Sequence, residues 1–348
     1  MAMTVHLKDI AAYTGFSAKT ISNVVNGKYA RVSAKSRVEI LEAIEKLNYQ
    51  PNIAARHLRN VQVGVIALAI PYLANPYFAE MANAITAAAV EHSYTVLLDC
   101  TEGKRENELL LVKGLRPHLI DGLILDAQSL TTDDIQPEEI KKPVVLLGER
   151  FFGAPYDHVI IDNVAAAYMA TNHLLSLGKQ RIAVIGVVEH GRSEVPVLRL
   201  QGFLQALKEA GQEMDPTLLV PMDSSSQVNG LDSWRRANGA EAMRYLLSLK
   251  YPPDAVFCFN DLLALGAMSV LHEASLRIPQ DVAIVGIDDI EDGRYATPAL
   301  TTIAPDKEEM SRLAVSLLLE RIKGTRQQPP ECITVPFHLR IRKSTMEG

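Results

Sequence analysis

From residue 61 onward, short apolar runs alternate with stretches of helical periodicity, and this alternation restricts the fold more than any other feature of the chain. The first series of runs that predict strands comprises residues 63–70, 95–99, 122–125, 144–147 and 159–161. Helical periodicity lies between them at 78–92 and 106–116. Short runs that are apolar at every position are typical of parallel strands covered by helices on both faces. The pattern therefore predicts an α/β fold.

A second series of the same kind begins with a predicted helix at 165–177 and continues through predicted strands at 181–186, 255–259 and 282–286. A chain of 348 residues exceeds the size at which one core keeps growing, so two series predict two doubly wound parallel-sheet lobes. In such sheets a ligand binds beyond the carboxyl ends of the strands. No G-x-G-x-x-G sequence follows a strand, which argues against a dinucleotide cofactor.

The first 47 residues have helical periodicity in three short segments. The first begins at Leu7 and ends at Gly15, which suits a left-handed helix end. Ser17 can cap a second helix at 18–26, and Ser33 can cap a third at 34–47. The second helix is expected to face inward with Ile21, Val24 and Val25, and outward with Lys19, Thr20, Ser22 and Asn23. The third is expected to bury Val38, Leu41, Ile44 and Leu47.

Charge is divided unequally between these two parts of the chain. The net charge is −6, yet residues 1–60 carry nine Lys and Arg against four Asp and Glu, a balance of +5 that leaves −11 for the rest. Two short helices joined by a tight turn, with the second one polar outside, have the geometry in which a recognition helix enters the major groove of DNA. A basic segment attracts phosphates and an acidic body is repelled by them. The first part is therefore predicted to bind DNA.

Several other classes of protein are disfavoured. Cys100, Cys258 and Cys332 lie far apart without a C-x-x-C pair or matching histidines, so neither a metal site nor a disulfide framework is expected. No G-x-S-x-G or H-E-x-x-H motif is present, so we do not expect an enzyme. The chain begins without a secretory leader and has no uninterrupted apolar segment of about 18 residues, which predicts a cytoplasmic protein. A periplasmic solute-binding protein is the alternative, but it would carry a leader and no helix-turn-helix.

The motifs of the first 60 residues occur together in one known family. They are Leu7-Lys8-Asp9-Ile10-Ala11, Gly15-Phe16-Ser17, Thr20-Ile21-Ser22, Val25-Asn26-Gly27, Val32-Ser33, Leu47-Asn48-Tyr49-Gln50-Pro51-Asn52 and Ala54-Ala55-Arg56-His57-Leu58-Arg59. This series resembles the headpiece of the lactose-repressor/galactose-repressor family of bacterial transcriptional regulators. The resemblance implies a homodimer that reads a pseudo-palindromic operator.

The resemblance also implies which residues bind DNA. Ala18, Lys19 and Asn23 would meet base edges in the major groove. Relatives commonly carry Arg where this chain has Asn23, and Asn pairs bidentately with adenine rather than guanine. A solvated surface amide is the alternative for Asn23. The full set implied to contact bases or phosphates, or to pack beside them, is Ser17, Ala18, Lys19, Thr20, Ser22, Asn23, Asn26, Asn52, Ala55, Arg56, His57 and Leu58.

Residues 52–58 can form a short helix that Asn52 caps. A helix of this length is not stable alone in water. The resemblance implies that it folds on DNA, pairs with its copy in the dimer and inserts Leu58 between base pairs of the minor groove, which is a known way to kink DNA. The alternative is that Leu58 is only the apolar side of a linker.

The body resembles the periplasmic-binding-protein-like core of the same family. Motifs in the expected order include Asn75-Pro76-Tyr77-Phe78, Asp162-Asn163, Phe259-Asn260-Asp261, Gly286-Ile287-Asp288-Asp289 and a closing strand at 339–345. The implied domains are a headpiece at 1–51, a hinge helix and linker at 52–61, an N-terminal lobe at 62–161 plus 291–323, and a C-terminal lobe at 162–290 plus 324–348. Crossovers between the lobes are expected near 162, 290–293 and 323–330.

A small effector is expected in the cleft between these lobes. Sugar hydroxyls are bound by charged donors and acceptors, with an aromatic face against the ring. The candidate residues are Arg199 and Asp288 as the leading pair, then Asn260 and Trp234, and further Tyr72, Phe78, Arg150 and Ser193. Trp234 could instead be a packed core aromatic and Asp288 a helix cap, while Asp261 is expected to cap the helix from Leu262. A purine-type effector needs a similar set and remains an alternative, and residues 148–156 depart from the lactose repressor.

Overall fold

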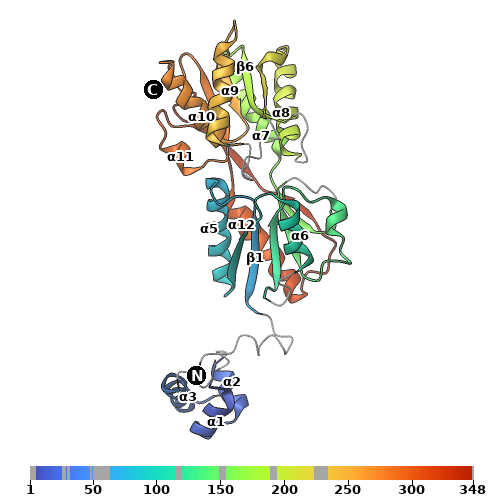
Figure 1. The fold of residues 1–348 in the computed structure, drawn as a ribbon, viewed down its shortest axis with the longest axis vertical. Coiled ribbons are helices and arrows are strands. Elements are labelled where there is room, and N and C mark those ends of the chain that lie inside the picture. The colour runs from blue at the N-terminus through green and yellow to red at the C-terminus, as the bar shows by residue number, and fades with distance from the viewer. Residues whose placement is uncertain are drawn as a thin grey trace. The chain divides into compact units, whose positions relative to one another are not determined.

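The computed structural model describes residues 5–25, 29, 32–47, 49, 63–114, 119–148, 154–188, 194–222 and 234–346. The chain divides into two compact units, Met1–Val63 and Gly64–Gly348 (Figure 1). The predicted hinge helix at 52–58 lies outside the described residues. No helix in the described ranges is long and apolar enough to cross a membrane.

The first unit contains the three predicted helices, α1 (Leu7–Thr14), α2 (Ala18–Val25) and α3 (Ala34–Lys46). Helix α1 ends because Gly15 adopts a left-handed conformation with φ of 73°. The hydroxyl of Ser17 accepts a hydrogen bond from the backbone N–H of Thr20 at 3.1 Å, and Ser33 accepts one from Ser36 at the same distance. Both predicted caps are therefore confirmed.

The core of this unit differs from the prediction along α3. Its buried residues are Ile10 of α1, Ile21 and Val24 of α2, and Ile40 and Ala43 of α3. Ile44 and Leu47 pack against this core as expected, but Val38 and Leu41 are 54% and 41% exposed, so their predicted burial is wrong. Each helical residue advances by about 100°, which turns a side chain two positions before Ile40 to the opposite side of α3.

The second unit begins with an N-terminal lobe built on a six-stranded parallel sheet in the order β11-β5-β4-β3-β1-β2. Its strands are β1 (Val65–Ile70), β2 (Thr95–Cys100), β3 (Gly122–Asp126), β4 (Val144–Leu147), β5 (Asp157–Ile160) and β11 (Cys332–Thr334). Its helices are α5 (Pro76–Glu91), α6 (Arg105–Lys113), α12 (Lys307–Lys323) and a 3-10 turn, η2 (Thr132–Ile135). The central strands β3 and β4 are buried along their whole length, as runs without polar alternation predict.

The C-terminal lobe is a second six-stranded sheet in the order β12-β10-β9-β8-β6-β7, parallel except for β12. Its strands are β6 (Ile182–Val187), β7 (Leu219–Pro221), β8 (Ala255–Cys258), β9 (Ala283–Ile287), β10 (Thr301–Pro305) and β12 (Phe337–Arg340). Its helices are α7 (Asn163–Ser176), α8 (Val195–Glu209), α9 (Arg236–Ser248), α10 (Asp261–Glu273), α11 (Glu291–Arg294) and the turn η3 (Pro216–Leu218). The packed pairs α7–α8 and α9–α10 cover its two faces (Figure 1). The two-lobed α/β fold is thus confirmed.

Two of the three predicted crossovers differ from the structure, and the remaining one, at residue 162, lies between β5, which ends at Ile160, and α7, which begins at Asn163. The chain returns to the N-terminal lobe only after β10, because Thr301–Pro305 pairs with β9 of the C-terminal sheet. It crosses for the third time between β11 and β12, since Cys332–Thr334 still pairs with β5. Residues 291–305 therefore belong with the C-terminal lobe and 324–334 with the N-terminal lobe, the reverse of the expected assignment.

Candidate DNA-binding and effector-binding sites

The outward surface of α2 carries the predicted DNA-binding residues that the structure describes. Ser17, Ala18 and Lys19 are exposed where this helix begins, and Thr20, Ser22 and Asn23 are partly exposed. The hydroxyls of Ser17 and Thr20 lie 2.9 Å apart. The first turn of α2 carries no acidic side chain, which would repel a DNA phosphate from the partial positive charge of the first N–H groups. A cationic and small-side-chain helix start of this kind suits a surface that meets DNA.

In the C-terminal lobe, three of the predicted effector residues lie together beyond the end of β8. The guanidinium of Arg199, on α8, lies 5.5 Å from the centre of the Trp234 ring. Arg199 also donates to the carbonyl of Phe259, the residue before Asn260. Asn260 in turn donates from its amide nitrogen to the Trp234 carbonyl at 3.2 Å. This position agrees with the expectation that a ligand meets the carboxyl ends of the strands.

Asn260 also has a structural role that was predicted for its neighbour. Its side-chain oxygen accepts from the Leu263 N–H at 2.8 Å and caps α10. Asp261 is the first helical residue, not the cap, and its fully buried carboxylate accepts hydrogen bonds from Thr302 Oγ1 at 2.6 Å and Ile290 N at 3.0 Å. Burial and the nearby charge of Asp288 raise the pKa of Asp261 well above its ordinary value. The predicted cap at Asp261 is therefore wrong.

Asp288 lies beyond the end of β9, the strand next to β8. It is 8% exposed and has a φ of 125°, and the following residue, Asp289, has a φ of 49°. Two consecutive residues with side chains in this region cost free energy and persist only where their surroundings hold them. The holding contacts include the Asp288 N–H to the Ile303 carbonyl at 2.9 Å and ion pairs from Asp289 to Arg294 and Arg342. Asp288 is not a helix cap.

The two predicted residues of the N-terminal lobe follow β1. Tyr72 donates from its hydroxyl to the Glu102 carbonyl at 3.1 Å. Phe78, on α5, packs partly buried against the lobe core with its ring 5.3 Å from that of Tyr77. Neither residue has a described contact with Arg199, Trp234 or Asn260, which together are called the Arg199 group below. The remaining predicted site residues lie outside the described residues, namely Asn26, Asn52, Ala55, Arg56, His57, Leu58, Arg150 and Ser193.

The structure adds one residue to the Arg199 group that the predicted site did not include. Asn163, at the start of α7, is 2% exposed and accepts from Arg199 Nε at 2.7 Å. Its amide nitrogen is buried and has no hydrogen-bond partner within the described part of the chain. The Asp162-Asn163 motif drew attention to this position in the sequence. Nothing in the sequence indicated that Asn163 would pair with Arg199, which lies 36 positions away.

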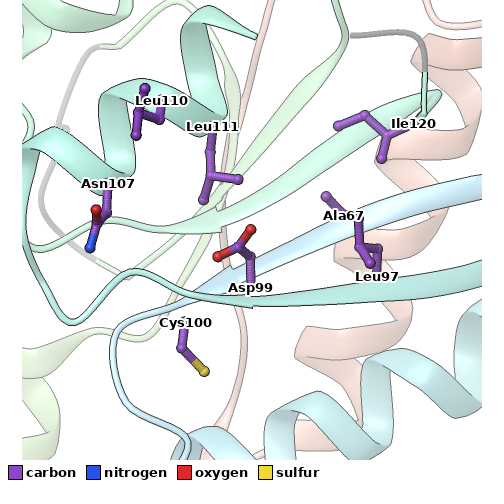
Figure 2. A pocket seen from close by; sticks show the side chains of 8 residues that line it. All are labelled: Ala67, Leu97, Asp99, Cys100, Asn107, Leu110, Leu111 and Ile120. Atoms are coloured by element: carbon purple, nitrogen blue, oxygen red, sulfur yellow. The ribbon is translucent and has the colours of Figure 1, made fainter. Parts of the chain in front are cut away.

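A cavity of about 260 Å³ lies elsewhere, in the N-terminal lobe between β1, β2 and α6 (Figure 2). Leu97, Leu110 and Leu111 line it together with the polar side chains of Asp99 and Asn107. None of the predicted effector residues is among those that line it. It is therefore separate from the Arg199 group.

Comparison with known proteins covers both units. Residues 6–52 match the family of bacterial regulatory proteins named lacI, and residues 171–345 match the periplasmic binding protein-like domain. The ribose operon repressor of Escherichia coli K12 is 34% identical over 323 residues, which cover 91% of this chain and 92% of that protein.

Solved structures of regulators have the same fold. The lac repressor dimer bound to operator and the anti-inducer ONPF matches with a TM-score of 0.84 at 28% identity, over 99% of this chain and 100% of that one. A lacI-family regulator from Enterococcus faecium with bound ribose matches with a TM-score of 0.69 at 28% identity, over 81% and 98%. The chain is therefore a transcriptional regulator of the lacI family, and not an enzyme.

Proposed function

We propose that this regulator is a cytoplasmic, homodimeric repressor whose affinity for a pseudo-palindromic operator is set by a sugar bound between its two lobes. DNA is bound by the outward surface of α2 and by the hinge residues 52–58, with Leu58 as the minor-groove wedge. The effector is bound by Arg199, Asp288, Asn260 and Trp234. Arg150, Ser193, Tyr72 and Phe78 complete the effector site.

The observation that carries the effector site is the Arg199 group at the end of β8. A buried guanidinium, an indole ring and an unpaired amide donor lie within one small volume of the C-terminal lobe. The indole supplies an apolar face for the C–H surface of a sugar ring, and charged groups supply strong hydrogen bonds to hydroxyls. The buried amide nitrogen of Asn163 favours a ligand that carries an acceptor, because a buried donor without a partner costs free energy.

A pentose is the first effector to test. The E. coli relative is a ribose operon repressor, and the E. faecium structure contains ribose. Purines remain the second class, since an arginine, a carboxylate and an aromatic ring also suit a nucleobase.

The experiment is a thermal-shift panel of D-ribose, cellobiose, D-galactose and hypoxanthine, with the emission of Trp234, the one tryptophan of the chain, as a second readout. A ligand at 100 times its Kd stabilises the folded state by about 2.7 kcal/mol, which raises the melting temperature by several degrees. The matched variant is Trp234→Phe, which keeps an aromatic ring. A shift with one sugar that Trp234→Phe reduces supports the site, whereas an equal shift in both proteins places the ligand elsewhere.

DNA binding is tested by selection from randomised duplexes followed by sequencing. A homodimer selects an inverted repeat whose half-sites are about one helical turn apart. Recovery of unrelated sequences would contradict sequence-specific binding, and the selected operator then allows titration with each ligand that binds.

A further inference from the structure

Two charged side chains of the N-terminal lobe, Glu80 and Lys307, contact the C-terminal lobe next to Asp288, a predicted effector-binding residue. Glu80 lies on α5 and Lys307 begins α12, both in the N-terminal lobe. Lys307 pairs with Glu80 and donates from its Nζ to the carbonyls of Asp288 at 2.7 Å and Asp289 at 3.2 Å, in the C-terminal lobe. Glu80 also accepts a hydrogen bond from the backbone N–H of Glu291 at 3.0 Å. The two side chains thus bind three successive parts of one C-terminal-lobe loop.

The Glu80–Lys307 pair is less exposed to water than most ion pairs in the described part of the chain. The side chain of Lys307 is only 12% exposed and that of Glu80 is 31% exposed, whereas a typical surface pair contributes little because water screens it. The Lys307 ammonium also lies 5.8 Å from the centre of the Tyr77 ring, which adds a cation–π contact. Three polar contacts and one ring therefore restrict a single flexible side chain.

The loop that Lys307 binds is the one with two consecutive positive φ angles. Asp288 and Asp289 adopt φ of 125° and 49°. An ammonium group that donates to both carbonyl oxygens stabilises the orientation of these two peptide groups, and hence the direction in which the Asp288 side chain leaves the backbone. Within the C-terminal lobe, Arg294 and Arg342 pair with the Asp289 carboxylate, and Arg294 also donates to the Asp289 carbonyl at 3.4 Å. The described hydrogen bond to the Asp288 carbonyl comes from Lys307 of the other lobe.

We propose that Glu80 and Lys307 form an inter-lobe latch that positions the Asp288 carboxylate for the effector. Because the latch requires both lobes, effector affinity depends on their arrangement, and an effector that binds Asp288 favours the lobe arrangement in which the latch is closed. Glu80 and Lys307 are positioning residues in this account. The assignment of Asp288 to the effector rests on the proposed function, but the latch itself does not.

The variants are Glu80→Gln and Lys307→Met, with Glu309→Gln as the matched control. Glu309 is also on α12 and pairs with Arg312, and its side chain is 33% exposed, close to the 31% of Glu80. It makes no described contact with the C-terminal lobe, so the same change there removes an ion pair without touching the latch.

The first measurement is hydrogen–deuterium exchange of the full-length, ligand-free protein. We expect exchange at the amide of Glu291 and in peptides covering 288–294 to accelerate about tenfold in both latch variants, because a hydrogen bond to a charged group is lost or weakened. Exchange in β8 should not change, and Glu309→Gln should behave as the wild type. Unchanged exchange at 288–294, or equal acceleration in β8, would overturn the latch.

The second measurement is calorimetric binding of D-ribose, or of whichever panel compound binds the wild type. We expect Kd to rise about tenfold in Lys307→Met and to stay within twofold in Glu309→Gln. Accelerated exchange with unchanged Kd would overturn the positioning role. If no panel compound binds the wild type, the proposed sugar effector fails, and the exchange measurement alone decides the latch.

Discussion

Replacing Arg199 is expected to affect both the stability of the C-terminal lobe and its response to effector. The side chain is 7% exposed and donates to Asn163 Oδ1 at 2.7 Å and to the Phe259 carbonyl. Arg199→Met keeps a long apolar stem but leaves these two buried acceptors without their donors. Each buried acceptor that loses its partner costs about 1–3 kcal/mol, so we expect a loss of about 2–6 kcal/mol in the free energy of unfolding.

A double-mutant cycle with Asn163→Leu separates this effect from a general loss of packing. When both partners are replaced by apolar groups, the unpaired acceptor at position 163 disappears with the arginine. The double variant should therefore be more stable than the sum of the two single changes predicts, by about 1–3 kcal/mol. Urea unfolding followed by far-UV circular dichroism and by Trp234 emission measures all four proteins.

The functional part of this prediction uses the same variants. Arg199→Met should bind the selected operator with wild-type affinity, because the headpiece forms its own compact unit, but should no longer respond to the effector. Additive stability losses would refute the buried pairing of Arg199 with Asn163. A normal response to effector in Arg199→Met would refute its place in the effector site.

Three further predictions concern DNA binding and acid stability. Leu58→Ser should weaken operator binding and leave effector affinity unchanged, and equal operator affinity in a titration would contradict the minor-groove wedge. Lys19→Ala should cost about 1–3 kcal/mol of operator binding and relax the sequence preference at one position of each half-site, which a repeat of the duplex selection would detect or exclude. Arg105 lowers the pKa of Asp134 to about 2 by hydrogen bonding, so the stability that this pair contributes is present above the unfolded-state pKa of about 4 and is lost as pH falls through about 2. The difference in urea midpoint between wild type and Arg105→Gln should accordingly be greatest at neutral pH and narrow below pH 4, and a difference that is constant with pH would count against the pairing.

Local signals in the sequence predicted the headpiece well. The caps at Ser17 and Ser33 and the helix end at Gly15 depend on residues at most four positions apart, so the sequence around each one determines it. The burial of α3 was less predictable. Several apolar rows are possible on one helix, and contact with α1 and α2, which selects the row containing Ile40 and Ala43, is tertiary information.

The strands of both lobes were also predictable from their apolar runs, but strand order was not. Thr301–Pro305 and Cys332–Thr334 each have a composition that suits either sheet, and pairing with β9 and β5 assigns them. The same limit applies to the effector site. Arg199 meets Asn163 across 36 residues and Lys307 meets Glu80 across 227, and no local pattern relates such positions.

The late position of α12, β11 and β12 in the chain has a consequence for synthesis on the ribosome. Helix α12 covers β3, β4 and β5, and β11 pairs with β5, yet both are translated after most of the C-terminal lobe. The apolar surface of the N-terminal sheet is therefore uncovered while residues 161–306 are made, and β12 completes the C-terminal sheet later still. Domains usually fold in the order in which they emerge, but here the N-terminal lobe needs β11 and the C-terminal lobe needs β12, and both strands follow α12 in the chain. A nascent chain of this regulator should consequently depend on chaperones, and a truncation before β11 should deprive both lobes of a strand.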